Sequence, residues 1–238
     1  ARVVAVSDRY SLPSNSVNLL DLQTPALKGK LAMARPTAGT TGGHVAALYT
    51  VWGDAKADAF FRALHANDIK LLGGNGPVVI LADADLTAAA EATASGCFAN
   101  AGQICSSSER ILVQSAVYDE FADRMVELAR QVVIGDPRQQ GVTMGRLNNL
   151  AVAETVAAPV ADAKARGAQA LIGGAPPPEM PSPLYFAPTG LANVSRDSLL
   201  NREETFGPVA PLIRAADDDD ALAVALETRY GLVASVFT

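Results

Sequence analysis

The stretch PVVILADADLTAAAEATASGCFANAG, residues 77–102, decides the fold together with RILVQ at 110–114. PVVIL is a continuous apolar run that a proline opens and acidic residues follow, which is typical of a strand buried on both faces. The Ala-rich segment after it predicts a helix that ends near Gly102, and RILVQ predicts the next strand. A strand, a helix and a second strand in this order form the repeating unit of an α/β fold.

The same alternation continues on both sides of this unit. Apolar periodicity predicts further helices, with Asp54 as an N-cap and Pro159 as a perturbation; they cover residues 44–52, 53–68, 116–132, 149–167 and 217–229. Short apolar runs predict further strands at 1–7, 31–36, 168–174 and 232–238. The five prolines within 175–185 predict an exposed loop. We therefore expect an α/β fold with largely parallel sheets flanked by helices.

Composition and charge narrow the class of protein. The 238 residues hold 19 Lys and Arg against 25 Asp and Glu, giving a net charge of −6 without a basic run, so nucleic acid is not an expected partner. No apolar window is long enough to cross a membrane, and the start is no signal peptide, so a soluble, cytoplasmic protein is expected. The two cysteines form no disulfide framework and are expected to be reduced. The first residue is Ala, and the last strand has no terminating element, so we expect a trimmed chain or a fragment.

Cys105 is the candidate nucleophile. It follows the predicted end of a helix at Gly102 and precedes a strand, where sheet proteins often place functional residues. Gly102 and the three serines at 106–108 surround it with small groups, which would admit a substrate and let backbone N–H groups approach an oxyanion. A buried, inert thiol is the alternative, and we assign that packing role to Cys97.

Several motifs in order resemble the aldehyde dehydrogenase superfamily. The segment at 71–129 contains the Gly-Gln-x-Cys turn, and NREETFGPVAPLI at 201–213 resembles the family's Glu-Glu-x-Phe-Gly-Pro motif. The resemblance implies a partial, Rossmann-like cofactor-binding region at 1–70 and a catalytic domain at 71–238. It also implies oxidation of a small aldehyde to a carboxylic acid with NAD or NADP, through a thiohemiacetal and a thioester, and it leaves a homo-oligomer possible.

The resemblance also assigns roles to single residues. Cys105 matches the nucleophile, Glu204 matches the glutamate that holds the nicotinamide ribose, and Phe206 matches the aromatic residue beside it. Without the motif, Glu204 would be interpreted as a solvated acid beside Arg202.

Towards the N-terminus the resemblance is fainter. Ser11 stands where the family has the asparagine that donates to the oxyanion, with Asn15 nearby as an alternative donor. Arg35 stands where the family has the lysine that holds the cofactor ribose, keeping its charge with a different geometry.

Two departures from the family concern the chemistry directly. Leu71 occupies the position of the general-base glutamate in LLGG at 71–74, and a leucine cannot activate water. The Gly-Ser-Thr-x-x-Gly turn that opens the helix under the pyrophosphate is missing, because RALHANDIK at 62–70 runs directly into this motif.

A metal site is not expected. His44 and His65, the two histidines, have no acidic residue or cysteine at ligand spacing. The run Asp217 to Asp220 is interpreted as a solvated cluster at a helix N-terminus rather than a calcium site.

Three functions stay open from the sequence. The first is an NAD(P)-dependent aldehyde dehydrogenase. The second is a cofactor-free relative that uses Cys105 for non-redox acyl or thioester chemistry, or that serves as an interaction partner. The third is an α/β domain without activity of its own.

Overall fold

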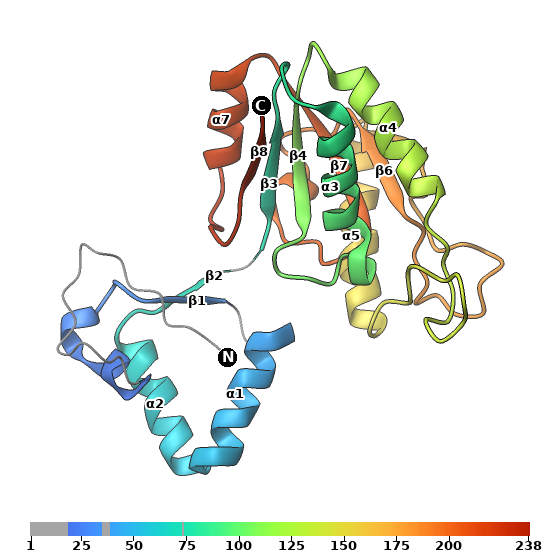
Figure 1. The fold of residues 1–238 in the computed structure, drawn as a ribbon. Helices are drawn as coiled ribbons and strands as arrows, with labels where there is room; N and C mark the ends of the chain where they lie inside the picture. Colours follow the sequence, from blue (N-terminus) through green and yellow to red (C-terminus); the bar gives the residue numbers. More distant parts are fainter. Residues whose placement is uncertain (1–18, 35–38, 73) are drawn as a thin grey trace. The chain divides into compact units, whose positions relative to one another are not determined.

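A computed structural model describes residues 19–34, 39–72 and 74–238 of the chain (Figure 1). The chain divides into two compact units, Ala1–Leu72 and Gly73–Thr238. The strand expected at 1–7 lies outside the described residues.

The first unit combines two helices with a small parallel sheet. Strands β1 (Ala32–Ala34) and β2 (Lys70–Leu72) pair in parallel, and the chain between them forms helices α1 (Gly39–Trp52) and α2 (Asp54–Ala66). Two short 3-10 helices, η1 (Leu19–Gln23) and η2 (Pro25–Leu27), precede β1. The Trp52 and Phe60 rings pack edge to face with centroids 5.3 Å apart, which fixes α1 against α2.

Two details of the first unit differ from the expectation. Asp54 is the first helical residue and not the N-cap, because Gly53 takes the cap position with φ of 76° and no side-chain cap bond forms. Asp54 still places a negative charge in the first turn, where the helix dipole favours it. Strand β2 was not foreseen, because its three residues are too few to show a period.

The second unit is built on a six-stranded sheet with the order β5-β6-β7-β4-β3-β8. All neighbouring pairs are parallel except β5 and β6, which confirms the largely parallel α/β fold. The strands are β3 (Gly76–Ile80), β4 (Ser108–Gln114), β5 (Gln169–Ile172), β6 (Thr189–Ala192), β7 (Val209–Ala215) and β8 (Ser235–Phe237). Every residue of β3 is buried, as the apolar run predicts.

Helices cover both faces of this sheet. They are α3 (Leu86–Phe98), α4 (Tyr118–Arg130), α5 (Leu150–Ala165), α6 (Leu199–Arg202) and α7 (Asp218–Leu226). The crossover from β3 to β4 and the crossover from β7 to β8 run in opposite directions along the sheet, so right-handed connections place α3 and α7 on opposite faces. Figure 1 shows α3 and α4 together in front of the sheet. Helix α5 continues through Pro159, which is buried.

A buried arginine ties the central strands to α7. Arg110 on β4 is fully buried, and its guanidinium donates to the carbonyl oxygens of Asn75, Val224 and Ala225 at 2.9–3.2 Å. Val224 and Ala225 lie in the last turn of α7, where the Val224 carbonyl oxygen also accepts the Glu227 N–H at 3.2 Å. The cation adds to the bonding of these terminal carbonyl groups and opposes the negative end of the dipole. Burial lowers the pKa of Arg110, which nevertheless stays a cation at neutral pH.

Candidate active site

The chain reverses sharply between α3 and the candidate nucleophile. After α3 a 3-10 turn, η3 (Ala99–Gly102), follows, and its residues Asn100, Ala101 and Gly102 have φ of 51°, 55° and 70°. Left-handed backbone costs a non-glycine residue roughly 1–2 kcal/mol, so the surrounding structure must hold this turn in place. The turn delivers Cys105 to an exposed position.

Gly102 allows the cysteine turn to approach the Phe-Gly-Pro segment. A Cβ on Gly102 would lie 2.0 Å from the carbonyl oxygen of Gly207, so no larger residue fits. The buried Ser107 hydroxyl donates to the Gly102 carbonyl oxygen at 3.0 Å and closes the turn from the other side. Among the three serines that follow Cys105, Ser107 therefore has a structural role in the turn.

Gln103 stabilises the same turn through hydrogen bonds of its side-chain amide. Its amide oxygen accepts the Asn148 N–H at 2.8 Å, and its amide nitrogen donates to the Asn100 carbonyl oxygen at 3.0 Å. The glutamine of the Gly-Gln-x-Cys motif thus connects the turn to the segment that precedes α5, a role that sequence reasoning did not assign.

Gly74 is the point at which Cys105 and Glu204 come together. The Gly74 N–H donates to Oε1 of Glu204 at 2.8 Å. A Cβ on Gly74 would lie 1.7 Å from the carbonyl oxygen of Cys105, so the cysteine backbone packs directly on this glycine. The structure therefore brings two sequence-predicted site residues, 99 positions apart, to one buried glycine.

The neighbours of Glu204 differ from those expected of a solvated acid. Arg202 pairs with Asp197 instead of Glu204, and the adjacent Glu203 takes the ion pair with Arg229. The Glu204 N–H donates to the Tyr230 hydroxyl at 3.2 Å. The interpretation of Glu204 as a solvated acid beside Arg202 is therefore wrong. The half-buried Phe206 follows with φ of 55°, so it is left-handed like the residues of the turn before Cys105.

Glu109 is a buried carboxyl group that sequence reasoning missed. It lies on β4 with 3% of its surface exposed, and its two oxygens accept the backbone N–H groups of Thr205 and Phe206, each at 2.9 Å. Burial raises the pKa of Glu109 to about 8, the Glu204 charge adds to the effect, and the two N–H donors oppose it. The only available signal was an acid at the start of an apolar strand.

Cys97 has the packing role expected of it. It is 1% exposed, its thiol donates to the Ser108 carbonyl oxygen at 3.1 Å, and burial raises its pKa well above the ordinary range. A thiol in such surroundings stays protonated and is not a nucleophile. The two cysteines therefore occupy opposite environments.

Other sequence-predicted site residues are not placed by the structure. Ser11, Asn15 and Arg35 lie outside the described residues, as does the side chain of Leu71, whose backbone belongs to β2. Within the described parts of the chain, no group of three His, Cys, Asp or Glu side chains could hold a metal ion. The same parts contain no helix that is long and apolar enough to cross a membrane.

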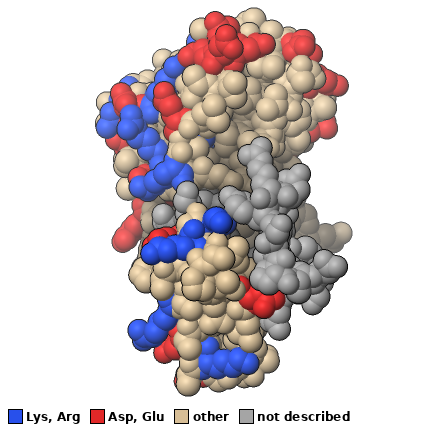
Figure 2. All heavy atoms as spheres, turned by 90° about the vertical axis from the view of Figure 1, so that its left-hand side faces the viewer, with Lys and Arg blue, Asp and Glu red and all other residues tan. Residues whose placement is uncertain are grey.

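The acidic run before α7 is a helix N-terminus. Asp217 caps the helix by accepting the Asp220 N–H at 2.9 Å, and the Asp220 carboxylate pairs with Arg196. Figure 2 shows acidic side chains gathered at the top of the face that it displays, the end at which α7 begins in Figure 1. The run therefore lies at a helix N-terminus, as the sequence interpretation expected, whereas the ion pair of Asp220 with Arg196 was not expected.

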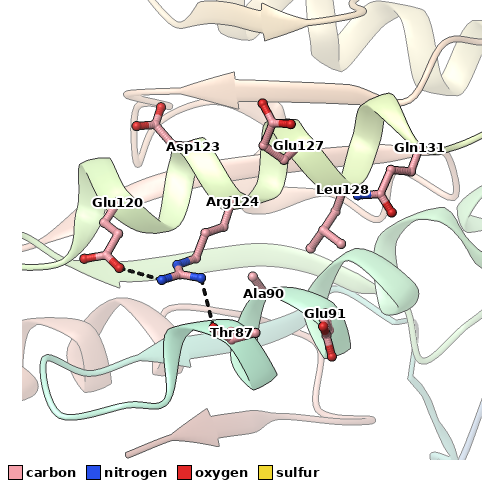
Figure 3. A pocket seen from close by; sticks show the side chains of 9 residues that line it. All are labelled: Thr87, Ala90, Glu91, Glu120, Asp123, Arg124, Glu127, Leu128 and Gln131. Carbon is pink, nitrogen blue, oxygen red and sulfur yellow. Dashed lines mark hydrogen bonds and ion pairs between the residues drawn. The ribbon is translucent and has the colours of Figure 1, made fainter.

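A groove between α3 and α4 is a separate surface. It has a volume of about 430 Å³, and Figure 3 shows Arg124 at its centre, bonded to Glu120 and Thr87. The lining residues are Thr87, Ala90, Glu91, Glu120, Asp123, Arg124, Glu127, Leu128 and Gln131. Neither Cys105 nor Glu204 is among them, so the groove is not the site described above.

Comparison with known proteins identifies the protein family. The family model of the aldehyde dehydrogenase family matches residues 63–238. A mitochondrial succinate-semialdehyde dehydrogenase of Arabidopsis thaliana is 40% identical over 167 residues, which cover 70% of this chain and 31% of that protein. The chain belongs to the aldehyde dehydrogenase family.

Solved structures agree with this membership. The crystal structure of succinate-semialdehyde dehydrogenase from Burkholderia pseudomallei matches with a TM-score of 0.70 and 34% identity, covering 77% of this chain and 38% of that one. Betaine aldehyde dehydrogenase from Staphylococcus aureus in complex with NAD+ matches with a TM-score of 0.68 and 27% identity, covering 77% and 37%. The chain therefore spans less than two fifths of each of these three proteins.

Proposed function

We propose that the protein oxidises a small aldehyde to a carboxylic acid with NAD or NADP as hydride acceptor and Cys105 as the nucleophile. One observation carries the proposal: the exposed Cys105 turn and the Glu204 segment meet at Gly74. A buried, inert cysteine would need none of the constraints that bring this turn to Glu204.

Cys105 would supply the covalent chemistry. Its thiolate adds to the aldehyde carbon, forming a carbon–sulfur bond and moving an electron pair onto the carbonyl oxygen. Ser11 and Asn15 are the proposed donors to that oxyanion. A bound NAD+ or NADP+ would supply the hydride acceptor, and loss of hydride from this carbon would leave a thioester on Cys105. Water adds to the thioester, and the acid leaves as the thiol is restored.

The residues around Glu204 suit the nicotinamide end of a dinucleotide. A half-buried carboxylate that Gly74 holds in place next to the cysteine segment can accept hydrogen bonds from ribose hydroxyls, and Phe206 lies two residues away. Arg35 is the proposed cation on the ribose. The diphosphate end fits less well, because the sequence lacks the Gly-Ser-Thr-x-x-Gly turn.

We assign these roles to two parts of the chain, a partial cofactor-binding region at 1–70 and a catalytic domain at 71–238. Semialdehydes are the proposed substrate class, supported by the names of the Arabidopsis and Burkholderia relatives. A carboxylate at the far end of the substrate distinguishes this class from simple aliphatic aldehydes.

A second candidate is acyl or thioester chemistry at Cys105 without a redox step. Leu71 in the place of the general base and the missing phosphate turn favour it. This candidate predicts hydrolysis of an activated ester by Cys105 that is unaffected by NAD+ or NADP+.

Titration of the purified protein with NAD+ and with NADP+ separates the two candidates. Intact-protein mass spectrometry on the same sample establishes which polypeptide is being titrated. Saturable binding that the Glu204→Gln substitution weakens supports the dehydrogenase. Absence of binding by a polypeptide of verified mass contradicts it, and ester hydrolysis that C105A abolishes then supports the second candidate.

A further inference from the structure

We propose that Glu109 is a positioning residue that sets the place of Glu204 relative to Cys105. This inference rests on the proposed function, because Glu204 matters to catalysis only as a cofactor-binding group.

Glu109 holds the segment that follows Glu204 by two hydrogen bonds, and we call this arrangement the clamp. Its two carboxylate oxygens hold the N–H groups of Thr205 and Phe206, which are consecutive in the chain. Two parallel bonds to adjacent backbone groups fix both the distance and the orientation of that segment, as one bond would not. Since Glu204 immediately precedes Thr205, its carboxylate position depends on this clamp.

Glu109 also belongs to the strand that the cysteine turn leads into. It lies four residues after Cys105, at the second position of β4. The clamp therefore runs from the nucleophile's own segment to the cofactor-binding segment. Gly102 against Gly207 is an independent contact between the same two segments. Gly74 connects them indirectly, because it packs on the Cys105 backbone and donates to Glu204.

The environment of Glu109 excludes an ordinary ion pair. Among the residues that the structure describes, no Lys or Arg nitrogen lies within ion-pair distance of its carboxylate, which is 3% exposed. A buried carboxyl group is costly unless hydrogen bonds satisfy it, and here backbone N–H groups are the partners of its two oxygens. The hydrogen bond to Glu109 stabilises the Phe206 backbone, whose φ of 55° is unfavourable for a residue with a side chain.

Gln is the informative substitution at this position. It keeps the size and one acceptor oxygen, but it turns an NH₂ group towards one of the two N–H donors, so one bond is lost and two donors face each other. Asp keeps both acceptors on a stem one methylene shorter, and E109D should therefore restore part of what E109Q and E109A lose.

Asp85 offers a matched control. Its carboxylate also accepts two backbone N–H groups, those of Thr87 and Ala88, but it caps the N-terminus of α3, the opposite end of the helix that leads to the cysteine turn. D85A removes the same kind of interaction from a place without a proposed part in catalysis.

The test measures steady-state kinetics of the purified protein and its E109Q, E109A, E109D and D85A variants, with succinate semialdehyde and NAD+ or NADP+. E109Q and E109A should raise the KM for the cofactor by about tenfold or more, E109D by less, and D85A by less than about twofold. The rate of Cys105 alkylation by iodoacetamide, without cofactor, should change by less than about twofold in every variant.

The inference is overturned if the cofactor KM of E109A matches that of D85A at equal loss of thermal stability. A wild-type protein without NAD(P)-dependent activity would be a failure of the proposed function alone. In that case amide hydrogen exchange tests the clamp: faster exchange at Thr205 and Phe206 in E109A supports it, and unchanged exchange refutes it.

Discussion

Raising the pH should destabilise the folded protein through Glu109. The folded state raises the pKa of this carboxyl from 4.5 to about 8, so the folded protein binds the proton more tightly than the unfolded chain does. The stabilisation is fully present below pH 4.5 and is lost as the pH rises through about 8. At about 1.4 kcal/mol for each pH unit, the complete window corresponds to a loss of about 5 kcal/mol.

Local opening limits this loss. If the segment at 203–208 swings away and hydrates the carboxylate, the fall in the free energy of unfolding stops at the cost of that opening, so a decrease of about 2–5 kcal/mol is expected. Urea unfolding at a series of pH values from 4.5 to 8.5, with the wild type beside E109Q, isolates the contribution of this group because Gln does not titrate. Equal pH slopes for the two proteins would refute the assignment of the shifted carboxyl to Glu109.

Further predictions concern the two cysteines, Leu71 in the place of the general base, the glycine of the turn and a helix cap. Iodoacetamide should modify one thiol in the native chain; C105A should abolish this reaction and C97A should retain it, whereas modification of both thiols would contradict the burial of Cys97. Because Leu71 cannot activate water, hydrolysis of the thioester should be slow and NAD(P)H should appear in a burst; absence of a burst would argue against this. L71E should raise the steady-state rate of aldehyde oxidation by about a hundredfold, because a general base typically contributes that much, while L71Q should not. G102A should lower the free energy of unfolding by about 2 kcal/mol or more, since φ is 70° and the new Cβ meets the carbonyl oxygen of Gly207; an unchanged urea midpoint would disprove this packing. D217A should cost about 1 kcal/mol in the same assay by removing the α7 cap, and a smaller change than in an exposed D219A control would show that the cap is not formed.

Much of the fold was predictable because local sequence and tertiary position agree. The run at 77–81 is apolar on both faces, and β3 is indeed buried throughout, since helices cover the sheet on both sides. The amphipathic helix at 116–132 appears as α4, whose Phe121 and Met125 face the core. Strand β2 and the cap at Gly53 escaped prediction, because three residues carry no period and because the cap depends on a backbone conformation that composition does not show.

The site was predictable only in part. Sequence motifs identified Cys105 and Glu204, which the structure brings to Gly74. They did not identify Glu109, because its importance comes from backbone N–H groups that lie 96 and 97 positions further along the chain. A side chain that binds main-chain atoms of a distant segment leaves no pattern of its own in a single sequence.

In the proposed reaction NAD(P)+ oxidises an aldehyde that is bound covalently to Cys105. The most direct measurement is the appearance of NADH or NADPH after the purified protein is mixed with succinate semialdehyde and NAD+ or NADP+, with the C105A and C97A variants in parallel. We expect reduced cofactor from the wild type and C97A, in an amount of at least one equivalent per chain, and none from C105A. Equal formation by C105A, or none by the wild type of verified mass, would contradict it.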